Sequence, residues 1–438
     1  MSSFLNDLHL TYRENRGIIM MIPVQSTFKF EFGLNSCLWC YNIKSSGRNF
    51  IMTKSQLNQI IGSKPCAKHI CGNGAEMLRY NACVTDTYMK LRKAYEEQGY
   101  TLYCEEPSNP IRSATYVKGD EYAVLFLFSW EKQLHVTVSK KGAKALPKLA
   151  AMEGYERICP VTLTQPKTAQ QGMCEIFRLE DGSFLIFDAC NRGAHDTIYQ
   201  TLCDLNGSSE NIRIRVWLMT HVHGDHYGGF LDFAKTYADA VTLDTVMFAP
   251  VNRDVISTIA SYKTPWDTID YFFNDSFCDF VKDHFPNTVV CSVHAGQRFR
   301  LPGADLRILF TPEHLYIDKI PINMNHGSIV AQVVGEDGKA LIMGDSEHCS
   351  TYWVVKTYQE TLKSDIFQYP HHGGGRVPDP VTTVLTLSRA VVIPCTADYY
   401  QRCSNSYTKM VENWEWTEAT YVMGHGTVTL LMSGEKIN

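Results

Sequence analysis

The run Thr220-His221-Val222-His223-Gly224-Asp225-His226 places three histidines and one aspartate within six residues. It follows the apolar residues 216–219, which predict a buried strand. His221 and His223 lie two residues apart on this extended segment, so both imidazoles can point the same way. Asp225 and His226 follow Gly224, where the chain can turn, so their side chains can face a second metal position. Because neutral imidazoles and carboxylates suit zinc, manganese or iron, the run predicts a site that holds two neighbouring cations.

From about residue 161 onward, apolar strands alternate with helices, which is typical of layered α/β architecture. Residues 184–187 predict a buried strand that ends at Asp188. The apolar face of the next helix is marked by Ile198, Leu202 and Leu205, before Gly207. Since rigid strands commonly fix functional loops, we expect the site at the strand ends.

With 438 residues, the chain is long enough for two or three domains. Residues 1–75 show no sustained period and are interpreted as an N-terminal extension of unclear structure. Residues 76–160 predict a small α+β domain, in which the spacing of Tyr88, Leu91 and Tyr95 indicates one helix. Its strand-like runs are residues 101–104, 114–118, 122–128 and 135–138. Residues 161–438 form the third predicted domain.

The motif resembles the H-x-H-x-D-H signature of the metallo-β-lactamase superfamily. Three further landmarks of that superfamily follow in the expected order: Phe187-Asp188-Ala189-Cys190, Gly344-Asp345 and Pro370-His371-His372-Gly373. The resemblance implies a four-layer αββα sandwich with a small N-terminal α+β domain. The Gly-Asp and Pro-His-His-Gly forms are most similar to the hydrolase domain of bacterial DNA-uptake channels and to phosphorylcholine esterases. The membrane channel itself is absent from this sequence.

The resemblance implies two divalent metal ions, with zinc as the first choice and manganese or iron as alternatives. The implied ligands are His221, His223, Asp225, His226, Asp345 and His372. The first two histidines would hold one ion. Asp225, His226 and His372 would hold the other ion, with Asp345 between the two ions.

The late pair and the early aspartate have further implied roles. His372 is favoured as the ligand and His371 as a substrate contact or proton donor, although spacing does not decide between them. Asp225 and His371 are the candidate catalytic residues. Asp188 would orient a ligand or the motif loop, as groups behind a metal site commonly do.

One stretch departs from the superfamily pattern. Many members carry a further histidine in G-H-T-x-G-S, whereas this chain has Asn325-His326-Gly327-Ser328. The DNA-uptake subgroup often has Asn and Ser there without a histidine. His326 is therefore either a ligand of the first ion or a polar loop residue. Cys190 stands where relatives often carry glycine, and a buried structural thiol is the favoured interpretation.

These residues predict a hydrolase that uses a metal-bound hydroxide, and the subgroup resemblance implies a phosphoester or phosphodiester substrate. The substrate would be a small molecule or an oligonucleotide. Hydrolysis of a carboxylic ester, lactone or β-lactam is the first alternative. A di-iron redox or oxygen-binding protein is the second.

Composition narrows the setting. A net charge of −5 argues against a general nucleic-acid surface, because such binding needs a basic face. The 15 cysteines are scattered without a disulfide pattern, which favours a reduced compartment. No apolar stretch is long enough to span a bilayer. We therefore expect a cytoplasmic protein without a membrane partner, and its oligomeric state stays open.

Two weaker patterns remain. A structural zinc clip formed by Cys37, Cys40, Cys66, Cys71 and His69 is a minor alternative, because zinc clips usually have tighter spacing. The other histidines beside strand-like segments are interpreted as structural: His284, His294 and His314.

Overall fold

The described residues of the computed structural model belong to one compact unit, Arg48–Asn438. They are residues 52–106, 111–139, 146, 154–251, 275–318, 324–374, 382, 385–403, 408, 411 and 413–437. Residues 1–51 of the predicted extension, with Cys37 and Cys40, lie outside them. None of the helices in these ranges has the length and apolar character needed to cross a membrane.

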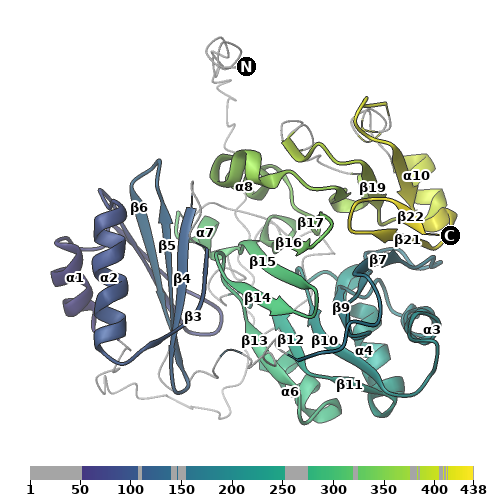
Figure 1. The fold of residues 1–438 in the computed structure, drawn as a ribbon, viewed down its shortest axis with the longest axis horizontal. Helices are drawn as coiled ribbons and strands as arrows, with labels where there is room; N and C mark the ends of the chain where they lie inside the picture. Colours follow the sequence, from purple (N-terminus) through teal and green to yellow (C-terminus); the bar gives the residue numbers. More distant parts are fainter. Residues whose placement is uncertain are drawn as a thin grey trace, which may run out of the picture. The chain divides into compact units, whose positions relative to one another are not determined.

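The first part of the described chain forms an antiparallel sheet with the strand order β1-β2-β6-β5-β4-β3 (Figure 1). Its strands are β1 (Ala67–Ile70), β2 (Glu76–Tyr80), β3 (Thr101–Glu106), β4 (Ile111–Lys118), β5 (Glu121–Phe128) and β6 (Gln133–Val138). Helices α1 (Lys54–Ile61) and α2 (Thr85–Glu97) share a buried core with it, to which α2 contributes Tyr88, Leu91 and Tyr95. The predicted helix and its four following strands are confirmed.

This small sheet begins earlier in the chain than the predicted boundary at residue 76. β1 pairs with β2, from Ala67 opposite Arg79 to Ile70 opposite Glu76. Helix α1 adds Leu57 to the core. Sequence periodicity does not reveal these two elements because both are short and no residue of β1 is fully buried.

Two further sheets make up most of the remaining described chain. One has the order β13-β12-β10-β9-β8-β7-β21-β22, with β11 beside β10. Its strands are β7 (Thr162–Gln165), β8 (Glu175–Arg178), β9 (Phe184–Phe187), β10 (Ile212–Leu218), β11 (Val241–Leu243), β12 (Thr245–Phe248), β13 (Val289–Ser292), β21 (Val428–Leu431) and β22 (Lys436–Ile437).

The other sheet has the order β14-β15-β16-β17-β18-β19-β20. Its strands are β14 (Arg298–Leu301), β15 (Ala304–Phe310), β16 (Val330–Gly335), β17 (Lys339–Ile342), β18 (Ile366–Gln368), β19 (Ala390–Ile393) and β20 (Ala419–Val422). The helices between the strands of these two sheets are α3 (His195–Asn206), α4 (Gly224–Tyr237), α6 (Asp275–His284), α7 (Glu313–Tyr316), α8 (His348–Tyr358) and α10 (Ala397–Cys403).

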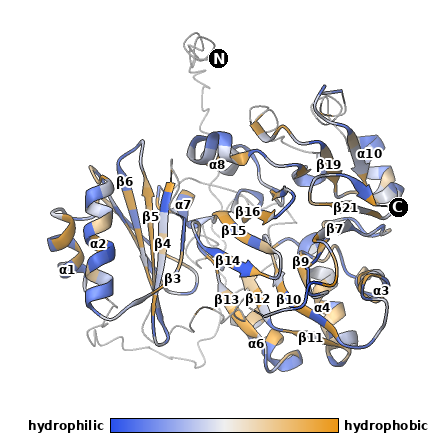
Figure 2. Cartoon of the chain, in the orientation of Figure 1, coloured by the Kyte–Doolittle hydropathy of each residue, from blue (hydrophilic) through white to orange (hydrophobic). Residues whose placement is uncertain are grey.

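Alternating side chains of β9 contribute to two buried cores. Leu185 and Phe187 belong to a core that also contains Ile342 of the other sheet. Phe184 and Ile186 belong to a core that includes residues of α3 and α4. Figure 2 shows β12 and β13 in the hydrophobic colour, as expected for strands covered on both faces. The first of these sheets is therefore packed between the other sheet and helices.

The second of these sheets is also covered on its outer side. Leu341 of β17 and Phe367 of β18 lie in one buried cluster with Val354 of α8. The order of layers is helix, sheet, sheet, helix, because each sheet buries one face against the other sheet and one face against helices. The predicted four-layer α/β sandwich is confirmed.

Parallel pairing brings the ends of strands that are distant in the sequence to one edge. β9 runs parallel to β10, with Phe187 opposite Leu218. β17 runs parallel to β18, with Leu341 opposite Phe367. Since the carboxyl ends of parallel strands lie at the same edge, the loops after these strands form one rim. That rim carries Asp188, His221, His223, Asp345, His371 and His372.

A glycine in helix α4 allows this helix to pack closely on the loop after β9. A Cβ atom at Gly229 would lie 1.9 Å from the carbonyl oxygen of Ala189. Gly229 N donates a 2.9 Å hydrogen bond to Cys190 O, and Ala189 N donates a 2.5 Å bond to His226 O. The missing side chain thus permits the contact that holds the first turn of α4 beside Asp188.

We expect Gly229→Ala to destabilise the fold by about 1–3 kcal/mol, because the added methyl group must push α4 away from Ala189. Urea unfolding followed by circular dichroism measures the loss. Gly426→Ala is the control, because a Cβ atom there meets nothing within 4 Å and its φ of 171° is extended. Equal free energies of unfolding for the two variants would contradict the proposed close contact.

Candidate metal centre

The motif residues lie where strand β10 leads into helix α4. His223 has extended backbone angles (φ −81°, ψ 146°) and directly precedes the helix. Asp225 and His226 occupy the first turn of α4, where His226 N donates a 3.0 Å hydrogen bond to His223 O. The change from extended to helical backbone therefore separates the side chains of His221 and His223 from those of Asp225 and His226.

Donor atoms from both sides of the sandwich converge at this rim. His221, His226 and Asp345 form one group, and Asp225, His226 and His372 form another, with the ligand atoms of each group within 4.8 Å of one another. Asp345 Oδ2 lies 3.2 Å from His226 Nε2 and 3.3 Å from His372 Nε2. His372 Nε2 also lies 3.1 Å from Asp225 Oδ2. The Asp345 carboxylate thus lies between the two groups.

Three buried donor atoms in this cluster form no hydrogen bond of good geometry among the described residues: His226 Nε2, His372 Nε2 and Asp345 Oδ1. The two nitrogens face carboxylate oxygens at 3.1 to 3.3 Å. A buried polar atom without a partner costs about 1–3 kcal/mol. A bound ion would remove that cost, and imidazole and carboxylate groups are the ligands that divalent transition metals prefer. The donor set therefore fits a metal ion.

The charges in the cluster also favour a cation. Burial lowers the pKa of His226, but the neighbouring carboxylates, with Asp345 first, outweigh burial and raise this pKa well above its usual value. Burial likewise opposes the charges of Asp345 and Asp225, which raise the pKa of His372 to about 10. Despite its burial, the pKa of Asp345 is held well below its usual value by His226 and His372. Without metal, both histidines therefore carry protons at neutral pH.

Contacts behind the donors fix their orientation. His226 Nδ1 lies 2.6 Å from Asp188 Oδ2. Thr220 N and Thr220 Oγ1 donate hydrogen bonds of 2.7 and 2.6 Å to the same carboxylate. His372 Nδ1 donates a 2.7 Å bond to Pro394 O. Because each Nδ1 is engaged, each Nε2 is turned toward the centre, which is the usual arrangement behind metal-binding histidines.

The structure separates the two histidines of the late pair. Both have left-handed backbone angles, with φ of 51° for His371 and 58° for His372. His372 joins a donor group and its side chain is 4% exposed. The side chain of His371 is 22% exposed, and its Nε2 lies 4.0 Å from Asp345 Oδ2. This geometry favours His372 as the ligand and leaves His371 beside the donors.

Glu347 is a candidate functional residue that the sequence analysis missed. It is buried, and its Oε1 accepts a 3.0 Å hydrogen bond from Asn325 Nδ2. The same oxygen lies 3.2 Å from His371 Nδ1, and Oε2 lies 3.5 Å from His326 Nε2. Its position two residues after Asp345 in the same strand-end loop is the signal that could have identified it.

Three other predicted residues lie outside the two donor groups formed by the described residues. His223 Nδ1 lies 3.1 Å from His221 Nε2. His326, a candidate ligand of the first ion, contacts Glu347 in the short turn Asn325–Gly327. Cys190 is fully buried, which raises the pKa of its thiol well above the usual value. The ligand roles inferred from the resemblance stay predictions.

No family profile and no curated protein matches this sequence. Among solved structures, the chain is similar to the metallo-beta-lactamase fold protein YhfI from Bacillus subtilis, at 9% identity and a TM-score of 0.36, covering 60% of this chain and 96% of that chain. Zn²⁺-bound PqqB from Methylobacterium extorquens gives 10% identity and a TM-score of 0.37, covering 62% and 99%.

CmlA, a diiron β-hydroxylase from Streptomyces venezuelae, gives 13% identity and a TM-score of 0.37, covering 81% of this chain and 79% of that chain. The chain shares with such structures a mixed α/β arrangement of sheets and helices. Because these TM-scores are below 0.5, the assignment of the site depends on the donor geometry.

We expect zinc binding at pH 7 to release about two protons, because His226 and His372 must become neutral to bind an ion. Calorimetric titrations in buffers of different ionisation enthalpy measure this number. Raising the pH above the His372 pKa of about 10 should reduce the release, since that proton is then already lost. Exposed His425 supplies the control, and His425→Ala should release as many protons as the wild type. Zinc binding without proton release would contradict the charge assignment.

Proposed function

We propose that this chain is a hydrolase that depends on two divalent metal ions, with zinc as the first choice. The proposed ligands are His221 and His223 for one ion and Asp225, His226 and His372 for the other, with Asp345 between the ions. The convergence of these donors, and the buried atoms among them without hydrogen bonds, support the proposal.

When bound, a pair of such ions lowers the pKa of water to near neutrality and neutralises charge on a substrate oxygen. The chain supplies the orientation. Asp188 and the carbonyl of Pro394 hold the rings of His226 and His372. The side chain of Asp225 is 26% exposed, more than those of the other donors in the two groups, and its carboxylate is the one we assign to orient an attacking water molecule.

The position of His371 is the observation that carries the proposed hydrolysis. Burial lowers the pKa of His371, but Glu347 and Asp345 outweigh burial and raise it above its usual value. The raised pKa favours the protonated imidazole, whose Nε2 lies 4.0 Å from Asp345 Oδ2 and 3.2 Å from Asn325 Nδ2. A proton held beside the reacting centre can be donated to a leaving group, which is typically worth about 10²–10⁴ in rate.

The proposed substrate is a phosphoester or phosphodiester, either a small molecule or an oligonucleotide. An anionic phosphoryl group suits a centre that combines two cations with a protonated His371. The net charge of −5 restricts nucleic-acid contacts to the site itself. We place this activity in the cytoplasm because the 15 cysteines show no disulfide pattern.

Purified protein supplied with zinc or manganese should hydrolyse bis(4-nitrophenyl) phosphate faster than nitrocefin or a lactone. His226→Ala should lower kcat/KM by more than about 100-fold, because His226 belongs to both donor groups. His425→Ala should retain wild-type activity. Elemental analysis of the same preparation separates zinc and manganese from iron. Unchanged activity in His226→Ala would remove the basis of the proposal, and faster turnover of the lactone or nitrocefin would assign the other substrate class.

We expect His371→Ala to lower kcat for an alkyl phosphodiester by about 10²–10⁴, because the leaving alkoxide then lacks its proton donor. The loss should be much smaller with a 4-nitrophenyl ester, whose leaving group needs no proton. Glu347→Gln should lie between the wild type and His371→Ala, since it keeps the imidazole. Metal content should stay the same in both variants. An equal loss on both substrates would assign His371 to metal or substrate binding.

A further inference from the structure

A second group of ligating side chains lies apart from the proposed catalytic centre. Cys71 Sγ, a ring nitrogen of His294 and a carboxylate oxygen of Glu313 lie within 4.8 Å of one another. The three residues are 6%, 3% and 5% exposed. None of them belongs to the two donor groups around Asp345. This group therefore needs its own explanation.

The group joins the small sheet to the sandwich. Cys71 directly follows β1 and begins the turn into β2, where Cys71 N donates a 2.9 Å hydrogen bond to Ala75 O. His294 lies after β13, and Glu313 begins α7. In the same turn, a Cβ atom at Gly72 would lie 2.2 Å from the carbonyl oxygen of Pro250. The turn therefore packs closely against the sandwich, and Cys71 lies beside His294 and Glu313.

Hydrogen bonds prepare one nitrogen of His294 for a ligand. His294 Nε2 lies 2.8 Å from Tyr122 Oη, and Asn73 Nδ2 donates a 2.7 Å bond to the same hydroxyl oxygen. A hydroxyl oxygen has two lone pairs, so it can accept from both nitrogens. His294 Nδ1 lies 2.7 Å from Glu313 Oε1 and donates a hydrogen bond to this carboxylate in the absence of metal, and a bound ion would take the place of that proton. A second nitrogen held in this way is usual for metal-binding histidines.

The charge of the group also favours a cation. Burial raises the pKa of Glu313, but the hydrogen bond and charge of His294 outweigh burial and lower this pKa below its usual value. The carboxylate is therefore ionised although it is buried. Burial, and secondly the charge of Glu313, raise the pKa of the Cys71 thiol in the absence of metal. A bound cation would favour the thiolate and balance both negative groups.

We propose that Cys71 Sγ, His294 Nδ1 and the Glu313 carboxylate bind one zinc ion, which fastens the β1–β2 hairpin to the sandwich. Thiolate, imidazole and carboxylate are the three side-chain ligand types of zinc. The combination of sulfur and nitrogen donors disfavours magnesium and calcium, which prefer oxygen. The proposal does not depend on the hydrolytic function.

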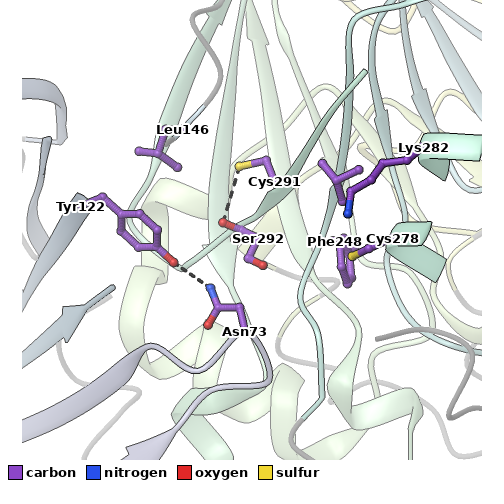
Figure 3. A pocket seen from close by; sticks show the side chains of 9 residues that line it. Asn73, Tyr122, Leu146, Phe248, Cys278, Lys282, Cys291 and Ser292 are labelled. Atoms are coloured by element: carbon purple, nitrogen blue, oxygen red, sulfur yellow. Dashed lines mark hydrogen bonds between the residues drawn. The ribbon is translucent and has the colours of Figure 1, made fainter. Parts of the chain in front are cut away.

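A cavity lies beside Tyr122 and Asn73, whose side chains are hydrogen-bonded to each other next to the proposed site. Figure 3 shows Tyr122 and Asn73 on one side of this cavity and Cys291, Ser292 and Lys282 on others. Its volume is about 160 Å³. Because Tyr122 also contacts His294, the cavity reaches the hydrogen-bonding shell of the proposed site. Three protein ligands leave the fourth position of a tetrahedral zinc ion for water.

Sequence spacing could not identify this group. The zinc-clip alternative groups Cys71 with Cys37, Cys40, Cys66 and His69, and Cys37 and Cys40 lie outside the described residues. Cys66 is exposed, and its thiol donates a 3.3 Å bond to Arg79 O. The partners of Cys71 in the structure come instead from segments far along the chain.

Cobalt(II) replacement tests this site, because a thiolate bound to Co²⁺ gives a strong charge-transfer band in the near ultraviolet. The full-length protein is freed of metal with a chelator and titrated with Co²⁺. The wild type should develop the band, and Cys71→Ala should lack it and bind one equivalent of Co²⁺ fewer. His226→Ala should keep the band although it weakens the catalytic centre, so the two sites are distinguished.

Cys190→Ala is the matched thiol control, because Cys190 is also buried and lies near the proposed catalytic centre. It should retain the full band. No band in the wild type, an unchanged band in Cys71→Ala, or loss of the band in Cys190→Ala would each overturn the proposal. If Cys71→Ala fails to fold, His294→Gln gives the same test with the thiol kept, because loss of the band supports the site and an unchanged band overturns it.

Discussion

The buried carboxylate of Asp345 is the group on which the rest of the rim depends. It is 2% exposed and lies between the Nε2 atoms of His226 and His372. An unpaired charge at such depth costs several kcal/mol, so positive charge must be present beside it, as protons on the histidines or as bound ions. Because His226 comes from α4 and Asp345 from the loop after β17, this requirement also joins the two sheets of the sandwich.

Backbone strain gathers at the same rim. Four residues without a glycine's freedom have left-handed angles there: Asp188, Cys190, His371 and His372. Each such residue costs about 1–3 kcal/mol, and strain of this kind persists where surrounding contacts hold it. Asp188 shows such contacts, because Trp217 Nε1 donates a 3.0 Å bond to its carbonyl oxygen while Thr220 donates to its carboxylate. The left-handed angles give these four side chains directions that they would not have in an extended strand end.

The contact between the small sheet and the sandwich also shows that a buried charge needs an opposite charge beside it. Two of its buried polar contacts need no charge: Ser113 Oγ donates a 2.5 Å bond to Gly296 O, and His135 Nδ1 lies 3.0 Å from His314 Nδ1. Burial lowers the pKa of His135 to about 3, so its imidazole is neutral. Glu313 differs, since it stays ionised at 5% exposure. A buried carboxylate therefore marks both proposed metal sites.

The amino-acid sequence alone determined the features that depend on residues close together along the chain. The α/β pattern, the strand that ends at Asp188, and the change from extended to helical backbone within the motif all follow from local periodicity and turn chemistry. Only the tertiary structure distinguished His372 from His371, brought Glu347 to His371, and assembled Cys71 with His294 and Glu313. These contacts join loops of different sheets, so they depend on strand pairing, packing and side-chain direction. Spacing along the chain carries no information about those quantities.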